Sequence, residues 1–141
     1  MKITVIITAY DRKKFILNAV KSVLSQKMQE GNYELIVVKN YNDKMIDSFL
    51  DKNGIKNVYS PDKSLGGKLN QAIKISTGEI ISFLEDDDVF LEGKLEYIYI
   101  PYLLRIKILY ITTISICRSM RNMNTQYIRI IPRTLICHAF P

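Results

Sequence analysis

The sequence is poor in residues that bind metals through sulfur or nitrogen. Its 141 residues include two cysteines, Cys117 and Cys137, and a single histidine, His138. Two cysteines without metal-type spacing give neither a zinc site nor a disulfide framework, so we expect free thiols in a reducing compartment. A lone histidine beside the C-terminus is expected to be a loop residue rather than a catalytic base.

Glycine is missing from the first predicted strand-to-helix turn. Residues 3–7 form a β-branched run, which predicts a strand buried on both faces. The turn after it, Thr8-Ala9-Tyr10-Asp11, contains neither the G-x-G-x-x-G fingerprint nor a P-loop. A standard NAD or ATP cradle is therefore not expected. Tyr10 either stacks on a base or packs the rim of the sheet, and both alternatives stay open.

Acidic residues are absent from the last third of the chain. Residues 97–141 contain six Lys or Arg and no Asp or Glu, whereas residues 1–96 contain 14 of each charge. The net charge of +6 therefore belongs to the tail, and no nucleic-acid partner is expected for the balanced first part. The apolar run 3–7 is too short for a signal peptide. We predict two parts, residues 1–96 as one half of a domain and residues 97–141 as a basic tail.

The first 96 residues alternate between strand-like and helix-like segments. Strands are predicted over 3–7, 33–38, 55–59 and 79–84, and helices over 15–27, 43–53 and 68–76. This alternation predicts an α/β fold, a mainly parallel sheet flanked by helices. Ligands of such sheets bind outside the carboxyl ends of the strands.

Several details of these helices can be predicted. Asp11 is expected to cap the first helix, and Asn42 or Asp43 the second, which Gly54 ends. Residues 61–67 are expected to form a loop. The inward faces are predicted to carry Met45, Ile46, Phe49 and Leu50 on the second helix, and Leu69, Ala72 and Ile73 on the third.

The run Glu85-Asp86-Asp87-Asp88 follows the fourth predicted strand directly. Four adjacent carboxylates repel one another, so water, a helix N-terminus or a divalent cation must offset their charge. The alternatives are a solvated turn that caps the next helix and a Mg²⁺ or Mn²⁺ site completed by substrate phosphates. The run lies at the predicted ligand-binding rim. This position makes the cation site as well supported as the solvated turn.

The sequence resembles the family 2 glycosyltransferases, which have the Rossmann-like GT-A fold. The first strand and turn, Val5-Ile-Ile-Thr-Ala-Tyr-Asp11, are similar to the family's strand and Pro-Thr-Tyr-Asn-like turn. The stretch from Asn70 to Val89 is similar to the signature Asn-x-Gly-x-x-x-Ala-x-Gly-Glu-x-Ile-x-Phe-Leu-Asp-x-Asp-Asp at the same spacing. The resemblance covers residues 2–95.

The resemblance implies roles for particular residues. Glu85 and Asp87 occupy the acids of the D-x-D motif and would hold Mn²⁺ or Mg²⁺ on the diphosphate of a nucleotide-sugar, with Asp88 beside them. Thr8 and Tyr10 would line the nucleoside pocket, and Lys68 and Asn70 would contact ribose or diphosphate. The implied donor-binding set is Thr8, Ala9, Tyr10, Asp11, Lys39, Lys68, Asn70 and Asp86.

The sequence also departs from the family pattern. Lys39 and Asn40 stand where the family commonly has two acids, one of which reads the base, so a uracil preference is not implied. Glu85 replaces the usual Asp, and Ala72 replaces a Gly. No acceptor-side base can be assigned, because no acid follows Glu96.

The tail allows three interpretations. The first is the product of a shifted reading frame or a truncation. The second is a segment that contacts a membrane surface through residues 97–117, and the third is an irregular subdomain. A transmembrane span is a poor fit, because Arg105 and Lys107 interrupt the apolar residues.

The resemblance implies a metal-dependent, inverting hexosyltransferase, complete or incomplete in this chain. It would move a sugar from a nucleotide-sugar to a glycan, lipid or protein acceptor in polysaccharide biosynthesis, in the cytoplasm or at the inner face of the membrane. The alternative is a non-catalytic remnant that binds the nucleotide-sugar. A nucleic-acid or membrane-surface binder driven by the tail ranks behind both.

Overall fold

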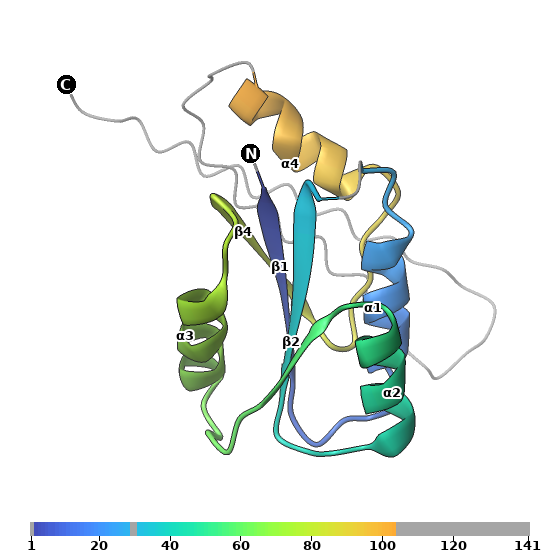
Figure 1. Ribbon diagram of the computed structural model, residues 1–141, viewed down its shortest axis with the longest axis vertical. Helices are drawn as coiled ribbons and strands as arrows, with labels where there is room; N and C mark the ends of the chain where they lie inside the picture. Colours follow the sequence, from blue (N-terminus) through green and yellow to red (C-terminus); the bar gives the residue numbers. More distant parts are fainter. Residues whose placement is uncertain (1, 29–30, 104–141) are drawn as a thin grey trace, which may run out of the picture.

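The chain folds into a parallel sheet with helices on both sides (Figure 1). A computed structural model describes residues 2–28 and 31–103. These residues form a sheet of four strands in the order β3-β2-β1-β4, all parallel. The elements are β1 (Ile3–Ala9), α1 (Ile16–Leu24), β2 (Tyr33–Lys39), α2 (Lys44–Lys52), β3 (Lys56–Tyr59), α3 (Leu65–Ile75), β4 (Ile80–Glu85) and α4 (Lys94–Leu103). The predicted α/β fold is confirmed.

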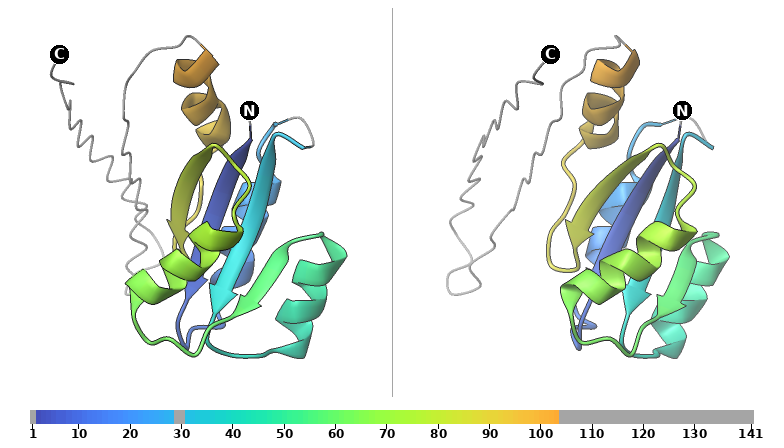
Figure 2. Two further views of the ribbon diagram at one scale, coloured as in Figure 1. Left: turned by 60° about the vertical axis from the view of Figure 1, so that its left-hand side comes forward. Right: turned by 90° about the vertical axis from the view of Figure 1, so that its left-hand side faces the viewer.

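Each face of the sheet has its own apolar core. Helix α3 covers one face and helices α1 and α2 cover the other (Figure 2). The larger core joins Ile3, Val5 and Ile7 to side chains of α1, α2 and the start of α4. The smaller core packs Ile6 against Ala72 of α3. Strand β1 lies between both cores, which is why its β-branched run is buried on both faces.

The strand register brings three chain segments together at one end of the sheet. Thr8 of β1 lies beside Val38 of β2 and Glu85 of β4. Because parallel strands end on the same side, the turns that follow β1, β2 and β4 all meet there. This end of the sheet, which we call the rim, carries the acidic run and the glycine-free turn.

One predicted helix cap is confirmed and another is wrong. The Asp43 carboxylate accepts hydrogen bonds from the backbone N–H of Met45 and Ile46 at the start of α2, and Gly54 follows that helix with φ of +64°. Asp11 does not cap α1. It has φ of +54° and is bonded to Asn40, and α1 begins five residues later without a side-chain cap.

Helix α3 begins earlier than predicted. The Ser64 hydroxyl accepts a hydrogen bond from the backbone N–H of Gly67 at 3.0 Å, so the helix includes residues predicted to be loop. Its buried stripe runs through Lys68 and Ala72, one turn apart, which turns Ile73 toward solvent. The inward placement predicted for Ile73 is therefore wrong. So is that of Met45, which is 68% exposed on α2.

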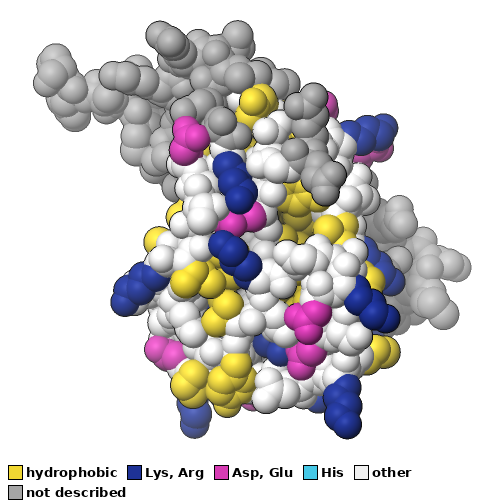
Figure 3. Space-filling view, in the orientation of Figure 1, with side chains coloured by type: hydrophobic (Ala, Val, Ile, Leu, Met, Phe, Trp, Pro, Cys, Tyr) yellow, Lys and Arg dark blue, Asp and Glu magenta, His cyan; other side chains and the backbone are white. Residues whose placement is uncertain are grey.

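The described part of the chain shows interspersed charge. On the face drawn in Figure 3, basic and acidic side chains are scattered among one another, in line with the balanced charge of residues 1–96. None of the helices in the described ranges is long and apolar enough to cross a membrane. Most of the tail, with Cys117, Cys137 and His138, lies outside the described residues, so the three interpretations of the tail and the predicted location stay predictions.

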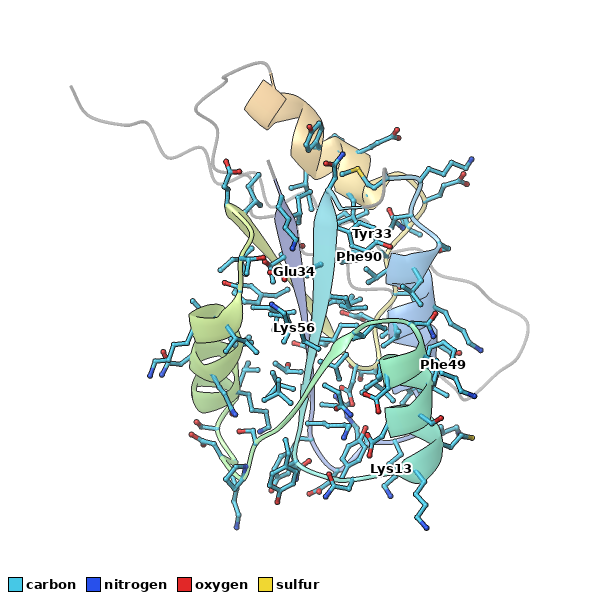
Figure 4. All side chains as sticks on the ribbon, in the orientation of Figure 1. Lys13, Tyr33, Glu34, Phe49, Lys56 and Phe90 are labelled. Atoms are coloured by element: carbon cyan, nitrogen blue, oxygen red, sulfur yellow. The ribbon has the colours of Figure 1, made fainter. Side chains whose placement is uncertain are left out.

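The amino-terminal end of the sheet is held by a charge cluster around Glu34 of β2. Its carboxylate accepts hydrogen bonds from the Thr4 hydroxyl at 2.7 Å, the Lys56 ammonium at 2.9 Å and the Thr77 backbone N–H at 2.5 Å. Figure 4 shows Glu34 and Lys56 next to each other on the sheet. Burial alone would raise the pKa of Glu34, but these hydrogen bonds outweigh it and lower the pKa to about 2.

Gly78 completes this end of the sheet. Its backbone N–H donates to the Thr4 hydroxyl at 2.9 Å. A Cβ at this position would lie 2.5 Å from the backbone nitrogen of Thr4, which leaves no room for any side chain. Backbone and side-chain donors here are thus matched to acceptors in a closely packed arrangement.

Candidate functional site

The first part of the rim is a cavity beside the carboxyl end of β4, bordered by Thr8 of β1 and by residues of α3. Glu85 is the last residue of β4 and is exposed, and its register partner is Thr8. Thr8, Glu85 and Asp88 line a cavity of about 240 Å³. The remaining lining residues are mostly apolar: Leu65, Leu69, Phe83, Leu84, Val89, Phe90, Leu91 and Lys94. Three residues predicted for donor or metal binding therefore share one cavity.

The next residue of the acidic run is buried. The Asp86 side chain is 1% exposed, and its Oδ1 accepts a hydrogen bond from Nη2 of Arg12 at 2.5 Å. Its Oδ2 has no hydrogen-bond partner among the described residues. Burial raises the pKa of Asp86, and the neighbouring Arg12 guanidinium offsets only part of this effect.

Arg12 also binds Asp87. Its Nη1 lies 2.7 Å from Asp87 Oδ2, and its Nη2 lies 3.3 Å from Asp87 Oδ1. The sequence analysis did not identify Arg12 as a site residue. The signal that could have found it is topological, because the turn after β1 lies next to the end of β4 when those strands are neighbours.

A divalent cation at the acidic run stays a prediction, and Asp87 is not among the residues that line the cavity with Glu85 and Asp88. Carboxylates are the hard donors that Mg²⁺ and Mn²⁺ prefer, and Asp86 Oδ2 adds an unmatched buried acceptor. The described residues contain no group of three Asp, Glu, His or Cys side chains arranged to hold a metal ion. Mg²⁺ sites with one or two carboxylates plus substrate phosphates do not need such a group. Glu85, Asp87 and Asp88 stay the predicted ligands.

The second part of the rim pairs Lys68 with Tyr10. Lys68 of α3 is 2% exposed, and its ammonium lies 4.6 Å from the centroid of the Tyr10 ring. Within the described residues the Lys68 ammonium has no ion pair with a carboxylate. Tyr10 is 41% exposed, which leaves ring surface free for contact. Asn70, two residues further along α3, is exposed.

Lys39 lies in a different environment from Lys68. Lys39 is the last residue of β2 and its side chain is buried. Its ammonium pairs with Asp47 Oδ1 at 2.7 Å and donates to the Tyr41 carbonyl at 2.8 Å. Hydrogen bonds from this ammonium and from Asn57, together with the Asp43 backbone N–H, outweigh burial and lower the pKa of Asp47. Its donors are directed into the protein, and the predicted contact between Lys39 and the nucleotide-sugar donor stays a prediction.

The turns after β1 and β2 are linked by hydrogen bonds between Asp11 and Asn40, which we call the Asp11–Asn40 clasp. The Asp11 backbone N–H donates to Asn40 Oδ1 at 2.9 Å, and Asn40 Nδ2 donates to Asp11 Oδ1 at 2.8 Å. Ala9 is 1% exposed, so its side chain offers no surface to a ligand. The structure thus brings together Thr8, Glu85 and Asp88, sets Tyr10 against Lys68, and binds Asp86 and Asp87 to Arg12.

The family model of glycosyl transferase family 2 matches residues 4–131. The match continues past residue 96, and the boundary proposed there stays a prediction. An uncharacterized glycosyltransferase of Nostoc sp. is 31% identical over 70% of this chain, which covers 32% of that protein. A poly(ribitol-phosphate) beta-glucosyltransferase of Bacillus spizizenii is 35% identical over 62% of this chain, which covers 15% of that protein. The chain therefore spans at most about a third of these relatives.

Solved structures share the fold. S. aureus TarS in complex with UDP-GlcNAc has a TM-score of 0.58 at 22% identity, over 71% of this chain and 30% of that one. A mannosyltransferase of Pyrobaculum calidifontis in complex with GDP-Man and Mn²⁺ has a TM-score of 0.55 at 20% identity, over 63% of this chain and 28% of that one. These likenesses confirm the predicted GT-A type of fold. Together with the match over most of its length, they lead to one conclusion: the chain belongs to glycosyl transferase family 2.

Proposed function

We propose that this chain binds a nucleotide-sugar at the rim, with a divalent cation, for transfer of the sugar to an acceptor. The observation that supports this best is the meeting of Thr8, Glu85 and Asp88 around one cavity at the ends of β1 and β4. This is the end of the sheet at which ligands of such folds bind. The nearby Lys68–Tyr10 pair adds a cation and an aromatic surface to the same end of the sheet.

The residues of the rim suit the parts of a nucleotide-sugar. The Lys68 ammonium is buried against the Tyr10 ring, and hydrogen bonds from Ser64 together with the charge of this ammonium lower the pKa of Asp62. Lys68 would therefore pair with a phosphate oxygen only where the Tyr10 ring moves aside. The half-exposed Tyr10 ring offers a stacking surface for a base. Glu85, Asp87 and Asp88 would hold Mn²⁺ or Mg²⁺. When bound, such a cation offsets negative charge on the departing nucleoside diphosphate.

The finer assignments extend the proposal. We infer an inverting transfer of a hexose-type sugar, from the family resemblance. A glycan-like polymer is our preferred acceptor class, ahead of a lipid or a protein, because the Bacillus relative is a poly(ribitol-phosphate) beta-glucosyltransferase. We therefore propose a role in polysaccharide biosynthesis. No residue is assigned as the acceptor-side base.

A second candidate is a donor-binding protein without transferase activity. It is favoured by the distribution of acids, because all 14 lie at or before Glu96 and an acceptor-side acid further along the chain is missing. Both candidates bind the donor, and only the first forms a glycosylated product or releases free sugar. A product assay with the full chain therefore separates them.

Donor binding is tested by calorimetry on the full chain with UDP-GlcNAc, UDP-glucose and GDP-mannose. At least one should bind with Mn²⁺ present and lose most of its affinity with EDTA. The Asp87→Asn variant should lose the same binding. Asp51→Asn, which changes an exposed carboxylate on α2, is the matched control and should bind normally. Absence of metal-dependent binding to all three sugars would contradict the proposal.

A further inference from the structure

Arg12 covers the carboxylate that is predicted to hold the cation. Both oxygens of Asp87 are bonded to its guanidinium, at 2.7 Å through Nη1 and 3.3 Å through Nη2. The same Nη2 lies 2.5 Å from Asp86 Oδ1. A metal ion cannot reach the lone pairs of Asp87 that point at Arg12 while these contacts persist.

The two halves of this contact differ in exposure. The Asp86 side chain is 1% exposed, so a counter-charge at this carboxylate must stay in place. Arg12 is 48% exposed and Asp87 is 38% exposed, so the contact between them lies in solvent. Exposed ion pairs contribute at most about 1 kcal/mol, which makes this half exchangeable.

We propose that Arg12 is the resident counter-ion of the acidic run and competes with the divalent cation for Asp87. This inference rests on the proposed function. Arg12 remains on the buried Asp86 while the cation displaces it from Asp87. The free protein therefore binds the cation weakly, and the guanidinium N–H groups released from Asp87 become donors for the phosphates that arrive with the nucleotide.

The first test is a calorimetric titration of the full chain with Mn²⁺ in the absence of nucleotide. Arg12→Gln should bind Mn²⁺ about fivefold more tightly than the wild type, the factor that corresponds to an exposed ion pair. Lys13→Gln is the matched control. It removes one positive charge from the same loop, where Lys13 pairs with Asp43 at 3.2 Å, and should change the affinity less than twofold. Equal or weaker binding by Arg12→Gln would overturn the inference.

A second measurement needs no substitution at Arg12. The Nε–H resonance of Arg12 is followed by NMR while Mg²⁺ is added, first to the wild type and then to Asp87→Asn. The wild-type resonance should move to a plateau as Asp87 exchanges Arg12 for the cation, and the variant resonance should stay in place. A wild-type resonance that does not respond to Mg²⁺ would overturn the inference even if Arg12→Gln fails to fold.

The failure of this inference can be told apart from that of the proposed function. If the wild type binds Mn²⁺ together with UDP, but Arg12→Gln matches it and the Arg12 resonance does not move, only the competition is wrong. If the wild type binds no Mn²⁺ with or without UDP, the proposed function and this inference are both wrong.

Discussion

The two ends of the sheet differ in how completely their buried charged groups are paired. At the amino-terminal end, the Glu34 carboxylate is matched by donors from Thr4, Lys56 and Thr77, and Gly78 is packed against Thr4 with no space left. At the rim, Asp86 keeps an unmatched buried oxygen and the Lys68 ammonium has no carboxylate partner among the described residues. One end thus pairs its buried charge with several donors, whereas the rim leaves a buried carboxylate oxygen without a hydrogen-bond partner among the described residues.

The largest effect that would sharpen this comparison is at Gly78. The Gly78→Ala variant should lose about 3 kcal/mol of unfolding free energy, because the new Cβ would lie 2.5 Å from the backbone of Thr4. Urea unfolding followed by circular dichroism measures it. Gly66→Ala is the control, since no atom lies within 4 Å of its Cβ in α3, and it should be neutral or stabilising. Equal stability of both variants would show that the amino-terminal end is not tightly packed.

The next effect compares carboxylates at the two ends. Glu34→Gln should cost about 2–3 kcal/mol of unfolding free energy, because it weakens several charge-assisted hydrogen bonds at once. Glu85→Gln, at the exposed end of β4, should change the unfolding free energy by less than about 0.5 kcal/mol while it weakens Mn²⁺ binding. If Glu85→Gln were the more destabilising of the two, the proposed difference between the amino-terminal end and the rim would be wrong.

A smaller effect compares the two buried lysines. Lys68→Met should lower affinity for the nucleotide-sugar about tenfold, equivalent to about 1.4 kcal/mol, because a phosphate would lose its cation. Lys39→Met should leave that affinity unchanged and reduce stability instead, since Asp47 would lose its partner. Calorimetry and urea unfolding on both variants decide between these roles. Reversed effects would favour Lys39 over Lys68 as the lysine that contacts the nucleotide-sugar.

The last prediction concerns how the unfolding free energy depends on pH, with a small change for each pH unit. Because the folded-state pKa of Glu34 is about 2 and its ordinary value is 4.5, its contribution to stability is complete above pH 4.5 and is lost as the pH falls toward 2. The difference in unfolding free energy between the wild type and Glu34→Gln should shrink by about 1 kcal/mol per pH unit in this window. A difference that stays constant from pH 5 to pH 2 would contradict the lowered pKa.

Predictions from the sequence were accurate where one short-range pattern decides the structure. The β-branched run of β1, the Asp43 cap and the stop at Gly54 each depend on neighbouring residues, and all three are found. The predictions for Asp11, Met45 and Ile73 failed because a more distant partner or the start of the helix decides them. Asp11 is held by Asn40, which is 29 residues away.

The candidate site shows the same limit. The sequence placed the acidic run and the turn after β1 at the rim, because both follow strands of a parallel sheet, whose carboxyl ends share one edge. It could not separate Lys39 from Lys68, since both are lysines near strand or helix ends and only the packing shows which ammonium pairs with a carboxylate. Arg12 was missed because its partners lie more than 70 residues away.

The Asp11–Asn40 clasp has one further consequence. Two reciprocal hydrogen bonds join an acid on one turn to an amide on the other and so link the turn after β1 to the turn after β2. An acid at residue 40 would set two carboxylates face to face unless residue 11 became an amide. The identities of these two positions are thus tied, because exchanging one residue alone would remove the match between donor and acceptor.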